Sequence, residues 1–233
     1  MKKNIFYTML FAAAMFTMTS CGDDESEGKS RITYYPTIEI KGDNPLIVAK
    51  GSSYEDPGYT SLMGGEDVSD QVTVSGLPDT SKSGLYTVRY TTAKNADGFD
   101  ASTTRRVVVA DPNDAVEGLY MLDASSYRVR DGAQVPYGDS YPVVVLAKSD
   151  GNYSVDDMLG GWYCLRAGYG TRYAMKATIS VAEDGTVELL ESEVPGWGDS
   201  HDDFTGTFDA ATGTFSLNTM YAGMDFIQTW VKQ

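Results

Sequence analysis

Hydrophobic and polar residues alternate along most of the chain with a period of two, which is the pattern of β-strands. In residues 85–92 this alternation puts Tyr86, Val88 and Tyr90 on one face, which we expect to point into the core. A turn of Asn, Ala, Asp and Gly at 95–98 leads into residues 102–109. The two segments are therefore predicted to form a β-hairpin.

Other short segments of this kind lie upstream and are separated by residues that favour turns. With the hairpin they make five strands within about 80 residues, which is typical of a β-sandwich. The predicted strands are residues 37–40, 46–49, 72–74, 85–92 and 102–109. We expect one domain of this type over residues 31–111.

A second series of short strands follows a break of turn-forming residues at 111–114. They are predicted at residues 118–122, 127–130, 141–148, 153–155, 161–167, 173–182, 186–191, 204–208, 214–218 and 225–231. Their connections are short, so consecutive strands are expected to pair antiparallel. Because an open sheet of about eight to ten strands exposes its edges, residues 115–233 are predicted to curl into a barrel or a sandwich. The fold class is all-β.

The N-terminus has the pattern of an export signal. Two lysines precede an apolar stretch at 5–16, which is shorter than the roughly 20 residues of a membrane-spanning helix. The stretch ends in Met-Thr-Ser-Cys at 18–21, which resembles a bacterial lipobox. The resemblance implies a signal peptide at 1–20 and acylation of Cys21, for example by palmitate. The alternative is an ordinary secretory signal with a coincidental cysteine.

An acidic segment follows this cysteine. Residues 21–30 contain Asp23, Asp24, Glu25 and Glu27 but no Phe, Ile, Leu or Val, so they are predicted to form a disordered linker. Such a run resembles the signal that sends lipoproteins to the outer face of the outer membrane in glycan-degrading gut bacteria. The resemblance implies a lipid-anchored protein of the outer membrane that is exposed at the cell surface.

Charge narrows the classes of partner. The formal net charge is −15, and loss of the two lysines of the signal peptide takes it to −17. A surface of this charge repels nucleic acid and anionic lipid. Binding of nucleic acid is therefore excluded, and contact with the membrane is expected through the lipid anchor only.

Few residues are suited to catalysis. Cys164 has no partner for an intramolecular disulfide if Cys21 is acylated, and its apolar neighbours predict a buried structural thiol. His201 is the single histidine, and the chain has no Gly-x-Ser-x-Gly motif. Two carboxylates could hydrolyse glycosides, but a domain of this size leaves little room for a deep cleft. We predict no catalytic residues and no enzyme activity.

Several motifs of the first domain carry a resemblance. They are Asp-Pro-Gly at 56–58, Asp-Val-Ser-Asp at 67–70, Ser-Gly-Leu-Tyr-Thr-Val at 83–88 and Ala-Asp-Gly at 96–98. These motifs are similar to the bacterial Ig-like domain found in pesticidal crystal proteins and many surface proteins. The resemblance implies a spacer or stalk without catalytic residues.

The second domain has motifs of its own. They are Gly-Leu-Tyr at 118–120, Tyr-Pro-Val-Val-Val-Leu at 141–146, Gly-Gly-Trp-Tyr at 160–163, Gly-Tyr-Gly at 168–170 and Tyr-Ala-Gly-Met-Asp-Phe at 221–226. This half resembles the uncharacterised C-terminal β-domain that follows such an Ig-like module in surface lipoproteins encoded beside starch-utilisation-type glycan importers. The resemblance implies this domain order and a cell-surface context, and it carries no established site residues. A polysaccharide or oligosaccharide ligand and importer components as partners are hypotheses that also draw on the anchor, the charge and the aromatic segments.

Aromatic residues gather around glycine-rich turns of the second domain. A sugar ring binds with its C–H face on an exposed aromatic ring and with its hydroxyls on carboxylates or amides. The candidate glycan-binding residues are Trp197, Trp162, Tyr163, Tyr169, Tyr173 and Asp199. Trp197 lies between two glycines and next to a proline in the chain; its alternative role is a plug for the end of a barrel. The alternative for Trp162 is packing in the core.

Acidic residues suggest a weaker candidate. Asp156, Asp157, Asp202 and Asp203 could supply oxygen ligands to calcium, which takes about six to eight hard donors. The chain has no EF-hand spacing, so calcium is not indicated and no other cofactor is expected.

Together these features predict a surface lipoprotein of the outer membrane that binds glycans as an accessory of a polysaccharide-uptake system. The alternative is a structural or protein-interaction component of the importer complex without a glycan site of its own. In that case the aromatic side chains would serve as packing groups.

Overall fold

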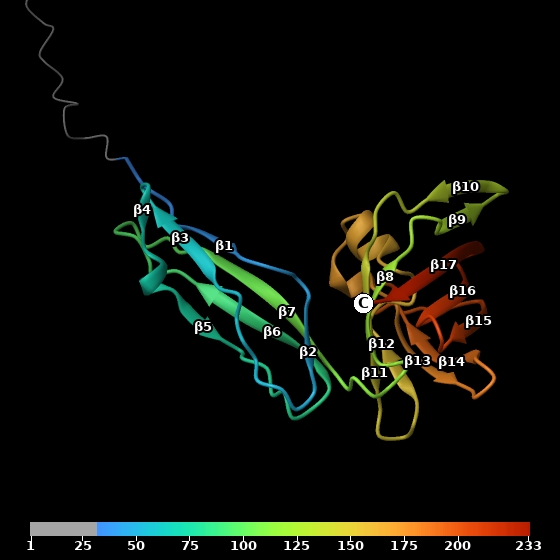
Figure 1. The fold of residues 1–233 in the computed structure, drawn as a ribbon. Coiled ribbons are helices and arrows are strands. Elements are labelled where there is room, and N and C mark those ends of the chain that lie inside the picture. The colour runs from blue at the N-terminus through green and yellow to red at the C-terminus, as the bar shows by residue number, and fades with distance from the viewer. Residues whose placement is uncertain (1–31) are drawn as a thin grey trace, which may run out of the picture.

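The computed structural model describes residues 32–233 and folds them into two β-domains joined side by side (Figure 1). This confirms the predicted all-β fold class. The predicted signal peptide at 1–20, the acylation site Cys21 and the linker at 21–30 lie outside the described residues. Within residues 32–233, no helix has the length and apolar character needed to cross a membrane.

The N-terminal domain packs two sheets face to face. The first sheet contains, in spatial order, β1 (Thr37–Ile40), β3 (Tyr59–Met63) and β4 (Glu66–Asp67). The second sheet contains β2 (Leu46–Ala49), β7 (Ser102–Ala110), β6 (Gly84–Thr91) and β5 (Thr73–Ser75), again in spatial order. A short 3-10 helix, η2 (Ser69–Gln71), joins β4 to β5. The predicted hairpin is β6–β7.

The core of this domain follows the predicted alternation. Val88 and Tyr90 are fully buried, and Tyr86 is partly buried against them. In β7 the inward face that carries Val107 and Val109 also carries Arg105, which is fully buried. Its guanidinium group donates hydrogen bonds to the carbonyls of Lys41 (2.5 Å) and Asp43. A buried cation of this kind is tolerated since backbone acceptors replace the lost water.

The C-terminal domain is a closed antiparallel barrel of eight strands. Around the ring these are β8 (Gly118–Leu122), β11 (Pro142–Ala147), β12 (Tyr153–Val155), β13 (Lys176–Val181), β14 (Thr186–Glu193), β15 (Asp203–Asp209), β16 (Thr214–Tyr221) and β17 (Met224–Lys232). Pairing of β17 with β8 closes the ring, with Met121 opposite Val231. Of the two architectures that the sequence left open, a barrel or a sandwich, the C-terminal domain therefore adopts the barrel.

One hairpin lies outside this ring. The strands β9 (Tyr127–Arg130) and β10 (Ala133–Pro136) pair with each other, and β9 continues the sheet from the start of β17. The barrel interior is filled largely by aromatic rings, among which Phe215 touches both Tyr120 and Trp230. Such rings bury a large apolar area in few residues, which lets a small barrel form a dense core.

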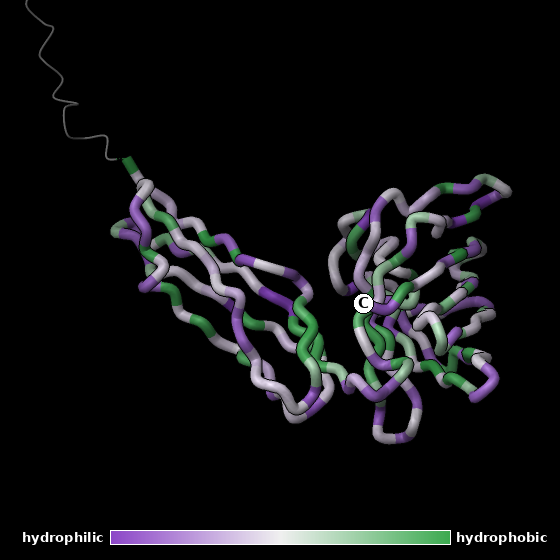
Figure 2. Tube along the Cα trace, in the orientation of Figure 1, coloured by the Kyte–Doolittle hydropathy of each residue, from purple (hydrophilic) through white to green (hydrophobic). Residues whose placement is uncertain are grey.

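The two domains share a continuous apolar interface. Val108 and Ala110 of β7 form a buried cluster with Leu119 and Val144 of the barrel. Figure 2 shows the hydrophobic end of the first domain facing the second at this joint. Polar contacts reinforce it: the carboxylate of Glu117, which is 1% exposed, accepts hydrogen bonds from the Ser83 hydroxyl (3.1 Å) and the Asp111 amide (3.0 Å).

One predicted strand was wrong. Residues 161–167 form a π-helical turn, η3 (Trp162–Arg166), and a 3-10 turn, η4 (Thr171–Tyr173), follows it. The reason is that Gly160 and Gly161 adopt left-handed backbone angles, with φ of 58° and 83°, which reverse the chain direction. β3, β4 and β10 were not predicted; in β3 the buried inward position is occupied by the polar Ser61.

The segment between β12 and β13 folds around the buried carboxylate of Asp157. Its Oδ1 accepts hydrogen bonds from the amides of Leu159 and Met175, both at 3.1 Å. Its Oδ2 accepts the amide of Gly161 at 3.1 Å and the thiol of Cys164 at 3.0 Å. The first turn of the segment and its return into β13 are thus held by one side chain that is 4% exposed.

Burial governs the protonation of this group. Loss of solvation raises the pKa of Asp157 from 3.8 to about 6, while the hydrogen bonds from Cys164 and the backbone act in the opposite direction. Because the pKa is higher in the folded state than in the unfolded state, the contribution of this group to stability is complete below about pH 4. It is lost as the pH rises through about 6.

We therefore expect acid to stabilise the wild-type chain relative to Asp157→Asn. The difference in unfolding free energy between the two should grow by up to about 3 kcal/mol from pH 7 to pH 4. Urea denaturation, followed by circular dichroism, measures the two unfolding free energies at each pH. Asp150→Asn is the control, because Asp150 is an exposed turn carboxylate whose pKa is lowered by hydrogen bonds from Asn152. The prediction would be contradicted if the difference in unfolding free energy between the wild type and Asp157→Asn stayed constant or decreased on acidification.

Candidate functional site

Four connections of the barrel converge at one end. The chain enters the barrel at the start of β8, beside the first domain, and the strands then alternate in direction. The segments at 123–141, 156–175, 194–202 and 222–223 therefore all lie at the end of the barrel opposite to the one at which the chain enters (Figure 1). The first domain reaches this end at one point, where Arg106 pairs with Asp156. Since loops at one end of a barrel are brought together by the scaffold, this end is the natural place for a site.

Trp197 stands at the tip of a tight loop between β14 and β15. Val194 closes the loop, because its amide donates to the carbonyl of Asp199 (2.8 Å) and its carbonyl accepts the amides of Trp197 (3.0 Å) and Gly198 (2.8 Å). The indole remains 44% exposed. The loop thus presents part of the ring to solvent.

A second loop braces the first. The amide of Gly196 donates to the carbonyl of Arg172 at 2.7 Å. The ring of Tyr173 packs so closely on Gly196 that a Cβ atom there would lie 2.5 Å from ring carbons. Glycine is needed at this position because only a residue without a side chain lets the two loops meet.

The predicted aromatic residues, with the exception of Trp162, form one surface cluster. The ring of Trp197 lies 4.8 Å from Tyr163, 4.8 Å from Tyr173 and 6.2 Å from Tyr169. Tyr169 is 56% exposed, and its ring plane is at 88° to that of Trp197. The exposed rings of Tyr169 and Trp197 therefore form a corner, which we call the aromatic corner, and Tyr163 and Tyr173 support it.

Asp199 lies at the edge of the aromatic corner. It is exposed, and its Oδ1 accepts a hydrogen bond from the hydroxyl of Tyr221 at 2.8 Å. Burial and this carboxylate together raise the pKa of Tyr221 well above its ordinary value. Tyr221 was not among the predicted site residues; the period-two alternation of β16 was the only signal that its ring points inward beneath Trp197.

Trp162 lies beneath the site. It is 3% exposed, with Tyr137 and Phe226 packed edge-on against it at 4.9 and 5.7 Å. Its ring also contacts two cations, since the guanidinium carbons of Arg128 and Arg166 lie 4.6 and 4.2 Å from its centroid. Direct contact of Trp162 with a ligand from solvent is not supported by this placement, so we assign the residue to the core.

The structure separates the four calcium candidates. Asp156 pairs with Arg106 of the first domain and accepts the amide of Val144, and Asp157 is enclosed by the backbone. Asp202 accepts the amide of Gly223, and Asp203 accepts that of Phe204. Among residues 32–233 no group of three or more potential metal-ligating side chains converges.

The remaining candidates for chemistry have structural contacts. Cys164 is partly buried, and burial beside Asp157 raises the pKa of its thiol well above the ordinary value. This thiol is therefore poorly suited to act as a nucleophile. His201 uses Nδ1 in a 2.8 Å hydrogen bond with the hydroxyl of Ser192.

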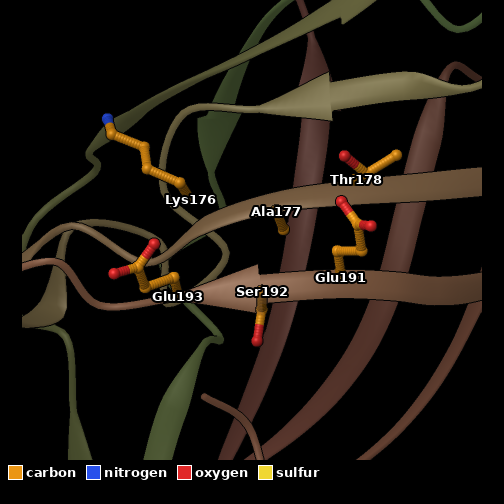
Figure 3. Close-up of a pocket in the computed structure, with 6 residues that line it drawn as sticks. All are labelled: Lys176, Ala177, Thr178, Glu191, Ser192 and Glu193. Atoms are coloured by element: carbon orange, nitrogen blue, oxygen red, sulfur yellow. The ribbon is translucent and has the colours of Figure 1, made fainter. Parts of the chain in front are cut away.

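A hollow of about 330 Å³ lies on the outer surface of β13 and β14 (Figure 3). Its polar side chains do not converge: the ammonium group of Lys176 points away from Glu193 in the figure. That ammonium group donates to the carbonyl of Asp156 at 2.7 Å. The aromatic corner is therefore the stronger candidate.

Comparison with known proteins agrees with the two-domain arrangement. The family model of the bacterial surface protein Ig-like domain matches residues 38–109. A second family model, which describes a C-terminal domain, matches residues 109–232, more than half of the chain. No match was found among curated proteins.

The crystal structure of the lipoprotein BT2262 from Bacteroides thetaiotaomicron is similar to this chain. The TM-score is 0.75 and the sequence identity is 38%, and the match covers 85% of this chain and 100% of that one. With these matches in both domains, the chain belongs to the family of BT2262-like lipoproteins, in which a bacterial surface Ig-like domain precedes this C-terminal β-domain.

Proposed function

We propose that this chain is a surface-exposed lipoprotein of the outer membrane that binds a glycan at the aromatic corner and serves a polysaccharide importer. The single observation that carries the proposal is the exposure of Trp197 and Tyr169 on a rigid framework at the loop end of the barrel. This framework lies at the end of the barrel opposite to the one at which the chain enters from the Ig-like domain.

The chemistry of the corner suits a sugar. Two exposed aromatic rings at a right angle offer an apolar face for the C–H side of a pyranose and a second wall beside it. Asp199 stands next to Trp197 in the same loop and keeps a second carboxylate oxygen for sugar hydroxyls, since only Oδ1 is used by Tyr221. Because the rings are held by neighbours, a ligand would lose little energy in ordering them.

Location is the second part of the proposal. The Met-Thr-Ser-Cys sequence at 18–21 supports acylation of Cys21, and membership of a lipoprotein family agrees with it. Two or three acyl chains hold a protein on a membrane, since each buried methylene contributes about 0.8 kcal/mol. The acidic residues that follow support export to the cell surface.

The aromatic corner could instead contact a protein component of the importer. Aromatic side chains are also common at protein interfaces, and the same exposed tryptophan would serve there. We favour a glycan because the exposed rings are accompanied by a fixed carboxylate that can accept hydrogen bonds from sugar hydroxyls. We propose binding without turnover.

Glycan binding should change the fluorescence of this protein through one residue. Of the three tryptophans, Trp162 and Trp230 are buried and Trp197 is exposed. A bound sugar is expected to shift the emission to shorter wavelength and to protect it from acrylamide. Trp197→Ala should weaken binding about tenfold or more, as the loss of an aromatic stacking contact implies. Calorimetry with plant, host-mucin and microbial polysaccharides measures the affinity of the wild type and of the variant.

The matched control is Phe99→Ala, which removes an aromatic ring of similar exposure (48%) from the Ig-like domain. Affinity for the glycan should be unchanged in this variant. If the intact protein binds none of the polysaccharides, the glycan proposal fails. Co-purification with importer components that depends on Trp197 would then establish the protein-binding role instead.

Membrane attachment should depend on one of the two cysteines. Cys21→Ser is expected to abolish labelling by radioactive palmitate and to move the protein from the membrane fraction to the soluble fraction, because the acyl chains supply the attachment. Cys164→Ser is the control and should retain both the palmitate label and the location in the membrane fraction. Addition of a protease to intact cells measures surface exposure of the protein, since only a protein outside the cell is digested. Persistence of the label in the Cys21 variant would refute acylation at this residue.

A further inference from the structure

The barrel domain places its arginines at one end. Residues 115–233 contain four, which are Arg128, Arg130, Arg166 and Arg172. All four lie on β9 or in the segment between β12 and β13, both at the end that carries the aromatic corner.

Two of these arginines are held by stacking on a buried ring. The guanidinium groups of Arg128 and Arg166 both lie over Trp162, and Arg166 also donates from Nε to the carbonyl of Tyr137 at 2.9 Å. Nε of Arg128 is buried and has no hydrogen-bond partner. Stacking fixes the planes of both groups without using their terminal nitrogens.

Three of the four lack an acidic partner. Within residues 32–233 no carboxylate lies within 4.0 Å of Arg128, Arg166 or Arg172, whereas Arg130 pairs with Asp131 and Arg106 pairs with Asp156. This contrast matters because the chain has a large excess of carboxylates. The guanidinium groups of Arg128 and Arg166 are thus fixed in place but not neutralised, and that of Arg172 is exposed, so the three are suited to bind an anion from solution.

The arginines adjoin the aromatic corner. Arg172 lies beside the loop of Trp197, because its carbonyl accepts the Gly196 amide at 2.7 Å, and the adjacent Tyr173 supports Trp197. Arg166 lies in the same turn as Tyr163, η3. The charge of Arg128 acts on the Tyr163 hydroxyl and opposes the increase in its pKa that burial causes. Asp199 and Asp202 lie on the side of the corner near Tyr221. The corner therefore has a basic side and an acidic side.

We propose that the ligand of the aromatic corner is an acidic glycan, whose carboxylate is bound by the unpaired guanidinium groups of Arg128, Arg166 and Arg172 while its ring contacts the exposed aromatic side chains. This inference rests on the proposed glycan binding and specifies the class of glycan. The acidic side of the corner accepts sugar hydroxyls, so the anionic group of the ligand must lie on the arginine side. A carboxylate suits it, because a guanidinium group can donate two parallel hydrogen bonds to one.

The test compares each glycan with its own neutral form. Polygalacturonate, polysialic acid and a glucuronate-containing polysaccharide are each offered with their carboxyl-reduced forms, and polyglutamate is the anion without a sugar. We expect one or more of the acidic glycans to bind at least about tenfold more tightly than its reduced form, since a charge-assisted hydrogen bond is worth about 1.5–3 kcal/mol. The preference should decrease as salt is raised.

Two variants assign the preference to the arginines. Arg166→Gln and Arg172→Gln should each reduce it, and Arg89→Gln, which removes an exposed arginine of the Ig-like domain, should not. Circular dichroism checks that each variant is folded. If Arg166→Gln unfolds the domain, Arg172→Gln still tests the inference, because Arg172 does not stack on Trp162. Equal binding of acidic and reduced forms, or of polyglutamate, overturns this inference and leaves glycan binding standing. Failure to bind any glycan, neutral or acidic, refutes the proposed function itself.

Discussion

The loop end of the barrel depends on one buried carboxylate. Asp157 accepts three backbone amides and a thiol from a segment that has almost no regular secondary structure to satisfy its own donors. Without it, the amides of Leu159, Gly161 and Met175 would be buried without partners, which is costly. The constraint brings the start of this segment next to its end, so that Trp162 enters the core while Tyr163 and Tyr169 remain at the surface.

The same organisation explains how a small domain can hold several aromatic rings at its surface. Trp197 is positioned by hydrogen bonds within its own loop, and Tyr173 of another loop packs on Gly196 beside it. Below them, Tyr221 and Phe226 come from strands of the barrel. Each exposed ring thus rests on others that are buried, and its exposed area is maintained by packing rather than by a flexible loop.

In the function that we propose, the Ig-like domain supports the barrel and the barrel binds the ligand. The Ig-like domain packs against the barrel through apolar residues of β7 and through Glu117, which makes the joint a packed interface and not a free linker. The proposed lipid anchor precedes its N-terminal end in the sequence. The aromatic corner lies at the end of the barrel opposite to the one at which the chain enters, and its exposed rings would be accessible from solvent on the tethered protein that we propose.

Much of this could be read from the order of residues, because a strand with one buried face needs alternation and a turn needs glycine, proline, asparagine or aspartate. The alternation predicted the β6–β7 hairpin with Val88 and Tyr90 inward, and ten short strands in the second half, of which only residues 161–167 did not form a strand. That segment is rich in aromatic residues, as strands are, and the turn at Gly160 and Gly161 decided against it.

The candidate site divides in the same way. Composition pointed to Trp197, Tyr163, Tyr169, Tyr173 and Asp199, since aromatic residues in glycine-rich segments are often exposed. It could not distinguish these from Trp162, because burial depends on which rings and strands surround a residue. Closure of the barrel through β8 and β17, the underlying ring of Tyr221 and the arginines stacked on Trp162 all involve residues far apart in the chain. Such contacts are set by tertiary packing, and no local pattern encodes them.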